Sequence, residues 1–211
     1  CQSCRPSIVI ASKPKLRMCV DYAVWLNQWA VLLKHPIPSI NYILEHLSRS
    51  KHFATLHLAK AFHQMSVPPS ERWKLAFTTV FENFTFTSLP FGPTNGPMKF
   101  QQLIESILSG VPHTYPYIDD INVSDDTPPG LLSLLRAIST RLRAANIRLN
   151  PRKTKLGFPD AEILGRHVSH CTISLTPERR NTILAIPFPK TRKQLRSFLG
   201  QALFFQPFVK F

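Results

Sequence analysis

The sequence predicts an α+β fold, and three observations support this prediction. Apolar residues recur at helical spacing in some segments and alternate with polar residues in others, so both periods occur in one chain. The 211 residues include 19 prolines and only 7 glycines, and the prolines separate short elements instead of gathering in a linker. The hydrophobic content of 44% is sufficient for a globular core.

The first predicted helix covers residues of about 39–49. Ser39 is a favourable N-cap, and the apolar residues between Ile40 and Leu47 recur at helical spacing behind it. Three strands are expected next. Phe53 to Leu58 and Trp73 to Phe77 are short apolar runs, and Phe84 to Thr87 alternates strictly after a turn.

A second helix is predicted after Thr94-Asn95-Gly96-Pro97, which supplies a cap and an early proline, and it should end at Ser109-Gly110. Tyr117 to Val123 is an apolar strand interrupted by Asp119-Asp120. Leu131 to Ala145 is predicted as a helix that carries Arg136, Arg141 and Arg143 on its polar side.

The last predicted helix begins at Thr191. Gln194 follows three residues later, as in a capping box. Its apolar residues Leu195, Phe198, Leu199 and Leu203 are expected to face a core, and its basic residues form the opposite face.

The chain is strongly basic. Lys and Arg number 26 against 12 Asp and Glu, which gives a net charge of +14. This excess favours a polyanionic partner, with a merely soluble basic surface as the alternative. No apolar run is long enough to span a membrane, so no membrane partner is expected.

The four cysteines are too scattered for a disulfide framework and indicate reduced intracellular thiols. Cys1 and Cys4 have zinc-like spacing, but no second ligand pair accompanies them, so we expect no zinc site. The first residue is Cys rather than Met, and we expect the chain to be a fragment of a longer reading frame.

The adjacent carboxylates of Asp119 and Asp120 are the main candidate for a chemical site. Two such charges are costly if buried without a cation. With Mg²⁺ they would supply hard oxygen ligands for phosphoryl transfer. Taken alone, an Asp-Asp pair also fits an ordinary surface turn.

Several motifs in order resemble the reverse transcriptases of gypsy-type LTR retrotransposons and retroviral Pol polyproteins. Tyr117-Ile118-Asp119-Asp120 resembles the YxDD signature of that family. The resemblance extends over nearly the whole chain, through residues 17–22 with 26–27, 53–64, 89–97 with 100–101, 149–153, 164–169 and 189–200. Ordered motifs over about 200 residues are far more specific than any one of them.

The resemblance implies a right-hand polymerase fold: fingers and palm, with an antiparallel palm sheet on helices, and a partial thumb. It implies fingers over residues 1–50, palm with an interleaved fingers segment over 51–170, and a partial thumb or connection over 171–211. It further implies two Mg²⁺ (or Mn²⁺) ions, dNTPs and an RNA/DNA template-primer.

The resemblance also assigns the family's catalytic and nucleotide-binding roles to residues of this chain. The resemblance implies that Asp119 and Asp120 are catalytic metal ligands, together with the backbone carbonyl of Leu58. It implies that Lys153 protonates the leaving pyrophosphate. The nucleotide pocket is implied at Arg17, Phe62, Phe91 and Gly92. Arg17, Phe62, Gly92 and Lys153 also have ordinary alternatives, namely a solvated cation, a core aromatic, a turn glycine and a surface lysine.

The chain departs from the family at His57, where the palm strand normally carries the third carboxylate. Mg²⁺ prefers oxygen ligands, and imidazole offers one nitrogen and no negative charge. We therefore expect impaired polymerisation. A partly buried histidine with a local partner is the favoured interpretation of His57, and a softer metal bound with the two carboxylates is the alternative. Ala23, where the family usually has arginine, is a second departure.

Three functions remain open: an RNA-directed DNA polymerase domain, a non-catalytic nucleic-acid-binding remnant, and a pseudogene product. No protease, RNase H or integrase segment is recognised in these residues. The resemblance implies an intracellular location, either cytoplasmic in a virus-like particle or nuclear.

Overall fold

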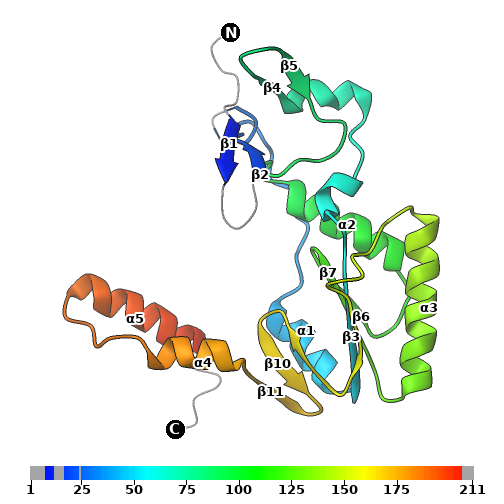
Figure 1. Cartoon of the computed structure of the whole chain (residues 1–211), viewed down its shortest axis with the longest axis vertical. Helices are drawn as coiled ribbons and strands as arrows, with labels where there is room; N and C mark the ends of the chain where they lie inside the picture. The colour runs from blue at the N-terminus through cyan, green and yellow to red at the C-terminus, as the bar shows by residue number, and fades with distance from the viewer. Residues whose placement is uncertain (1–7, 12–16, 24, 206–211) are drawn as a thin grey trace.

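The protein is described by a computed structural model, which covers residues 8–11, 17–23 and 25–205. A four-stranded antiparallel sheet with the strand order β6-β7-β3-β8 forms its centre (Figure 1). The α+β prediction is confirmed. The strands of this sheet are β3 (His52–His57), β6 (Thr114–Tyr117), β7 (Asp120–Asp125) and β8 (Lys155–Phe158).

Two helices cover one face of this sheet, α2 (Gly96–Leu108) and α3 (Pro128–Ala144). Side chains alternate between the faces of a strand, so Ala54 and Leu56 of β3 point toward these helices together. The buried core on this side includes Ala54, Leu56, Leu58, Phe100, Ile104, Ile121, Val123, Ile138 and Leu142.

The other face packs against α1 (Ile40–Ser48) and a three-stranded sheet of order β11-β10-β9. Phe53, adjacent in sequence to Ala54, belongs to this second core together with Ile43, Leu44, Leu47, Ile163 and Val168. Ser39 caps α1 as predicted, because its hydroxyl accepts the Tyr42 N–H. The strands of the smaller sheet are β9 (Asp160–Ile163), β10 (Arg166–Ser169) and β11 (Thr172–Leu175).

Two small hairpins lie at the opposite end from α1 (Figure 1). The residues at this end share a third buried core, which includes Val20, Tyr22, Val67, Leu75 and Phe77. The hairpins are β1 (Ile8–Ala11) with β2 (Arg17–Val20), and β4 (Ala76–Thr78) with β5 (Asn83–Thr85), and the 3-10 helix η2 (Pro69–Leu75) leads into β4. The other 3-10 helix, η1 (Ala61–Gln64), packs on the core of the central sheet.

The two last helices, α4 (Pro177–Leu184) and α5 (Arg192–Phe205), extend away from the central sheet (Figure 1). The predicted capping box is confirmed, because Thr191 Oγ1 accepts the Gln194 N–H and Gln194 Oε1 accepts the Thr191 N–H.

The prediction that α5 faces a core is wrong within the described residues. Leu195, Phe198, Leu199 and Leu203 are 46%, 37%, 50% and 67% exposed. Helical spacing shows that a face can be buried, but it does not supply the surface that covers it.

Other predictions need correction. Trp73 to Leu75 lies in η2 and not in a strand, because Pro68 and Pro69 open a 3-10 turn there. Tyr117 to Val123 is divided into two paired strands instead of one. Asn95 precedes α2 but makes no side-chain cap. Its amide bonds the backbone of Val31 and Leu33 instead.

Arg141 of α3 donates to the backbone carbonyls of Ile107 and Ser109 at the end of α2. It therefore satisfies carbonyl groups that a helix end leaves without partners. Among the described helices, none is both long and apolar enough to cross a membrane.

Candidate active site

The β6–β7 hairpin places the two adjacent carboxylates at the end of the central sheet. Tyr117 pairs with Asp120 across the hairpin, so Ile118 and Asp119 form its turn. Ile118 has a φ of 50°. The left-handed region costs an L-residue about 1–2 kcal/mol, and a β-branched side chain is unusual there. The turn therefore needs support from surrounding contacts.

The antiparallel register of β3 and β7 places His57 directly opposite Asp120. Paired residues of two strands project from the same face of the sheet. His57 Nδ1 lies 2.7 Å from Asp120 Oδ1, with the side chains 21% and 34% exposed. The prediction of a partly buried histidine satisfied by a local partner is confirmed, and that partner is a carboxylate of the YIDD motif.

Backbone contacts hold His57 from the other side. Its N–H donates to Thr154 Oγ1 at 3.3 Å, and its carbonyl accepts the Asn150 N–H at 2.8 Å. Leu58 N–H donates to the Asp119 carbonyl at 2.8 Å. The end of β3 is therefore joined both to the hairpin and to the segment before β8.

Asp119 is the carboxylate in the less favourable environment. Its Oδ1 is buried, and no hydrogen-bond partner reaches it within the described part of the chain. Burial is the largest influence and raises the pKa of the Asp119 carboxyl. The charge of His57 lowers this pKa, Asp120 raises it and Lys153 lowers it, with a net increase above the ordinary value. Ionised Asp119 therefore favours the approach of a cation.

Lys153 is exposed, and its positive charge acts on Asp119. Its N–H donates to the Asn150 carbonyl at 3.2 Å, which places it in the turn that also contacts His57. Lys153 thus acts electrostatically on Asp119, and Leu58 is joined to Asp119 through its N–H and not through the carbonyl to which a role was assigned. The roles themselves stay predictions.

Phe62 and Phe91, two of the four residues predicted to line a nucleotide pocket, belong to one aromatic cluster. The rings of Phe62 and Phe91 meet edge to face with centroids 5.3 Å apart, and Phe62 also contacts Phe100 at 5.5 Å. Phe91 is 40% exposed. Phe62 is therefore anchored in the core while Phe91 offers a face to solvent. Arg17 lies in β2, and its side chain is outside the described residues, as are Cys1 and Cys4.

Gly92 is required by the fold itself. Its φ is 113°, and a Cβ placed there would lie 2.8 Å from the Val20 carbonyl oxygen and 2.9 Å from Cδ2 of Tyr22. Asn27 holds the same loop, because its amide donates to the Gly92 carbonyl and accepts the Thr94 N–H. The turn interpretation of Gly92 is thus sufficient without a ligand.

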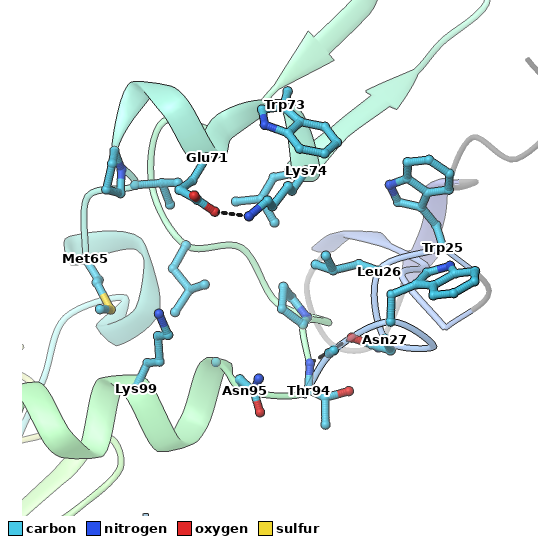
Figure 2. A pocket seen from close by; sticks show the side chains of 18 of the residues that line it. Trp25, Leu26, Asn27, Met65, Glu71, Trp73, Lys74, Thr94, Asn95 and Lys99 are labelled. Atoms are coloured by element: carbon cyan, nitrogen blue, oxygen red, sulfur yellow. Dashed lines mark hydrogen bonds and ion pairs between the residues drawn. The ribbon is translucent and has the colours of Figure 1, made fainter. Parts of the chain in front are cut away.

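A cavity of about 590 Å³ lies apart from the carboxylates. Figure 2 shows Trp25, Leu26 and Asn27 on one side of it, with Trp73 and the Glu71–Lys74 ion pair on another. Its lining is mainly apolar and contains none of Asp119, Asp120 and His57. The carboxylate end of the sheet remains the better candidate for chemistry, because it gathers the groups that can bind a cation.

Sequence reasoning gave Gln101 and Asn27 only as members of motifs that resemble the family, without a role of their own, and it did not single out Thr154. Gln101 is fully buried and bonds the carboxylate turn. Neither its place in a motif nor its position on the apolar side of a helix reveals the hydrogen-bond partners of Gln101.

The fold and this site together define a class: template-directed polymerases with a right-hand fold, in which a palm hairpin presents adjacent carboxylates. The fold resembles the foamy viral protease–reverse transcriptase in complex with dsDNA, with a TM-score of 0.87 and 28% identity over 95% of this chain and 36% of that one. The same viral protein in complex with an RNA/DNA hybrid gives a TM-score of 0.83 with 28% identity, over 95% of this chain and 27% of that one.

The chain belongs to the reverse transcriptase (RNA-dependent DNA polymerase) family, which it matches over residues 2–202. Retrovirus-related Pol polyproteins of Drosophila melanogaster are among its relatives. The polyprotein from transposon opus is 34% identical over 97% of this chain and 21% of its own length. The one from transposon 297 is 30% identical over 97% and 20%. The chain thus spans about a fifth of these relatives, and it corresponds to the reverse transcriptase domain of such retroelement Pol polyproteins.

Reverse transcriptases use divalent metals, and the residues present here fit such ions only in part. Asp119 offers a buried carboxylate oxygen, but the Asp120 carboxylate is bonded to His57. Among the described residues, no three His, Cys, Asp or Glu side chains gather into a metal-binding group. Imidazole is also a poor ligand for Mg²⁺. The site therefore does not fit a pair of magnesium ions.

Proposed function

We propose that this chain is an RNA-directed DNA polymerase domain whose nucleotidyl transfer is impaired at His57. The observation that carries the proposal is the 2.7 Å contact between His57 Nδ1 and Asp120 Oδ1. The contact supports the proposal in two ways. The resemblance places a carboxylate at position 57 where this chain has histidine, and the imidazole engages Asp120, one of the two carboxylates of the YIDD motif.

The expected size of the defect follows from the electrostatics of phosphoryl transfer. Removal of one well-placed charge-stabilising group costs roughly 10²–10³ in rate. The histidine at position 57 also lacks the negative charge with which a carboxylate would help Asp119 and Asp120 to hold a divalent cation. We therefore expect extension by this chain in Mg²⁺ to be near background.

Other parts of the polymerase site support the family's chemistry. We infer that Phe62, Phe91 and Gly92 border the nucleotide, that Arg17 contacts its triphosphate, and that Lys153 acts on the leaving pyrophosphate. The edge-to-face pair of Phe62 and Phe91 and the electrostatic influence of Lys153 on the pKa of Asp119 are consistent with these roles. Two bound metal ions would complete the site in an active relative.

A second function is favoured by a separate observation, the net charge of +14. A polymerase fold that has lost its chemistry can still hold a template-primer duplex through phosphate contacts. Solved relatives are complexes with dsDNA and with an RNA/DNA hybrid. Duplex affinity that falls steeply with salt, without extension, would identify such a non-catalytic binder. Failure of the expressed chain to fold would support the third alternative, a pseudogene product.

The test is primer extension on an RNA template. The chain, its His57→Asp variant and its His57→Asn variant are compared in Mg²⁺ and in Mn²⁺, after circular dichroism shows that all three are folded. Asparagine removes the imidazole without adding charge, so it is the matched control. We expect extension by His57→Asp alone, at least about 10²-fold above the other two.

Extension by the unmodified chain at a rate close to that of His57→Asp would overturn the proposal. If no variant extends while all bind duplex, the chain is a binding domain with more than one lesion. In that case the departure at Ala23 is the next position to restore.

A further inference from the structure

Gln101 of α2 is fully buried beside the hairpin that carries the carboxylates. Its Oε1 accepts the Ile118 N–H at 2.7 Å, and its Nε2 donates to the Pro116 carbonyl at 2.8 Å. One side chain therefore bonds the backbone on both sides of Tyr117. The residue it holds most directly is Ile118, whose φ of 50° makes the turn unfavourable without support.

Glu105, one helical turn further along α2, determines which way the Gln101 amide points. Gln101 Nε2 donates to Glu105 Oε1 at 2.7 Å. An ionised carboxylate only accepts hydrogen bonds, so the nitrogen of the amide must face Glu105 and its oxygen must face Ile118. With this orientation both amide hydrogens and the amide oxygen are paired, as a buried amide requires.

His35 holds the other oxygen of Glu105. Its Nε2 lies 2.7 Å from Glu105 Oε2, with the side chains 25% and 30% exposed. His35 belongs to the extended segment that leads into α1. The same segment is fixed to the start of α2 by Asn95, whose side chain bonds the backbone of Val31 and Leu33.

We propose that His35, Glu105 and Gln101 form a positioning relay that sets the Ile118 turn and thereby the placement of Asp119. The relay deepens the proposed function and rests on it for its catalytic consequence. Asp119 is the residue after Ile118, and its own carbonyl is held from the far side by Leu58 N–H at 2.8 Å. The turn is thus clamped between α2 and β3, and neither clamp uses the carboxylate itself.

The first readout is hydrogen exchange of the Ile118 amide, measured by NMR in the full chain with His57 unchanged. Gln101→Met preserves the length of the side chain but removes its bonds. Gln102→Met is the matched control, because Gln102 is the next residue on α2 and is exposed. We expect exchange at Ile118 to accelerate about tenfold or more in Gln101→Met, with no change in the control.

The His35 end of the relay has its own pair of variants. His35→Gln retains a donor toward Glu105, whereas His35→Leu does not. We expect His35→Leu to accelerate exchange at Ile118 and His35→Gln to restore protection. This pair also covers the case in which Gln101→Met does not fold, since His35 is partly exposed.

The catalytic consequence is tested in the His57→Asp background. Gln101→Met should lower kcat by roughly tenfold to a hundredfold with little change in the KM for dNTP, because a small displacement of a reacting group affects the transition state more than ground-state binding. Equal exchange at Ile118 in Gln101→Met and Gln102→Met would overturn the relay, and so would equal exchange in His35→Leu and His35→Gln. If His57→Asp does not extend primers, the proposed function fails, while the exchange measurements still decide the relay.

Discussion

The substitution His57→Asp should change stability in a way that depends on metal. The imidazole of His57 bonds Asp120 at 2.7 Å with both side chains mainly buried. Hydrogen bonds to charged groups contribute about 1.5–3 kcal/mol. The variant loses this bond and gains a third carboxylate beside Asp119 and Asp120, so like charges repel.

In EDTA, which removes divalent ions, we therefore expect the free energy of unfolding of the variant to be about 2–3 kcal/mol lower than that of the unmodified chain. At roughly 2–4 °C per kcal/mol for a chain of this length, Tm should fall by about 4–12 °C. A divalent ion that binds only the folded variant stabilises it by about 2.7 kcal/mol at 100 times Kd. Saturating Mg²⁺ or Mn²⁺ should thus return most of the lost stability.

Thermal unfolding followed by circular dichroism, in EDTA and in Mg²⁺, measures both effects. His167→Asp is the matched control, because His167 Nε2 pairs with Asp160 Oδ2 at 2.9 Å at a more exposed position. A surface pair contributes only up to about 1 kcal/mol, so this control should lose little and gain nothing from Mg²⁺. An equal Mg²⁺ shift in His57→Asp and in the unmodified chain would refute the reasoning.

Three further predictions follow from single residues. Burial raises the pKa of Asp119, so its ionisation costs stability as the pH rises from the ordinary carboxyl pKa to the raised one. Asp119→Asn should therefore increase the free energy of unfolding by about 1 kcal/mol at pH 7 and leave it unchanged at pH 3, as measured by urea titration. Gly92→Ala should lower the free energy of unfolding by about 1–3 kcal/mol, since its Cβ would lie 2.8 Å from the Val20 carbonyl; urea midpoints report this. Arg141→Ala removes donors from the end of α2, and the urea midpoint should fall by an amount equivalent to about 1 kcal/mol.

Local patterns in the sequence predicted the helices better than the strands. Ser39 and Thr191 cap α1 and α5 as expected, because a cap involves only the next three residues. The strand predicted from Trp73 to Phe77 is confirmed only at Ala76 and Phe77, which lie in β4. Its first part was wrong because apolar content alone did not reveal the turn that Pro68 and Pro69 begin. The apolar face of α5 was expected to meet a core, and its exposure shows that periodicity carries no information about a partner.

The sequence by itself determined the family and the adjacent carboxylates of Asp119 and Asp120, and it predicted that His57 replaces a third carboxylate, because ordered motifs and residue types are local properties of the chain. Only the tertiary structure decided that His57 bonds Asp120 across 63 residues of sequence, and that Gln101, oriented by Glu105, holds the Ile118 turn. The physical reason is that contacts between distant residues depend on strand register and on helix packing against the sheet. Both are set by the whole core and by no single segment.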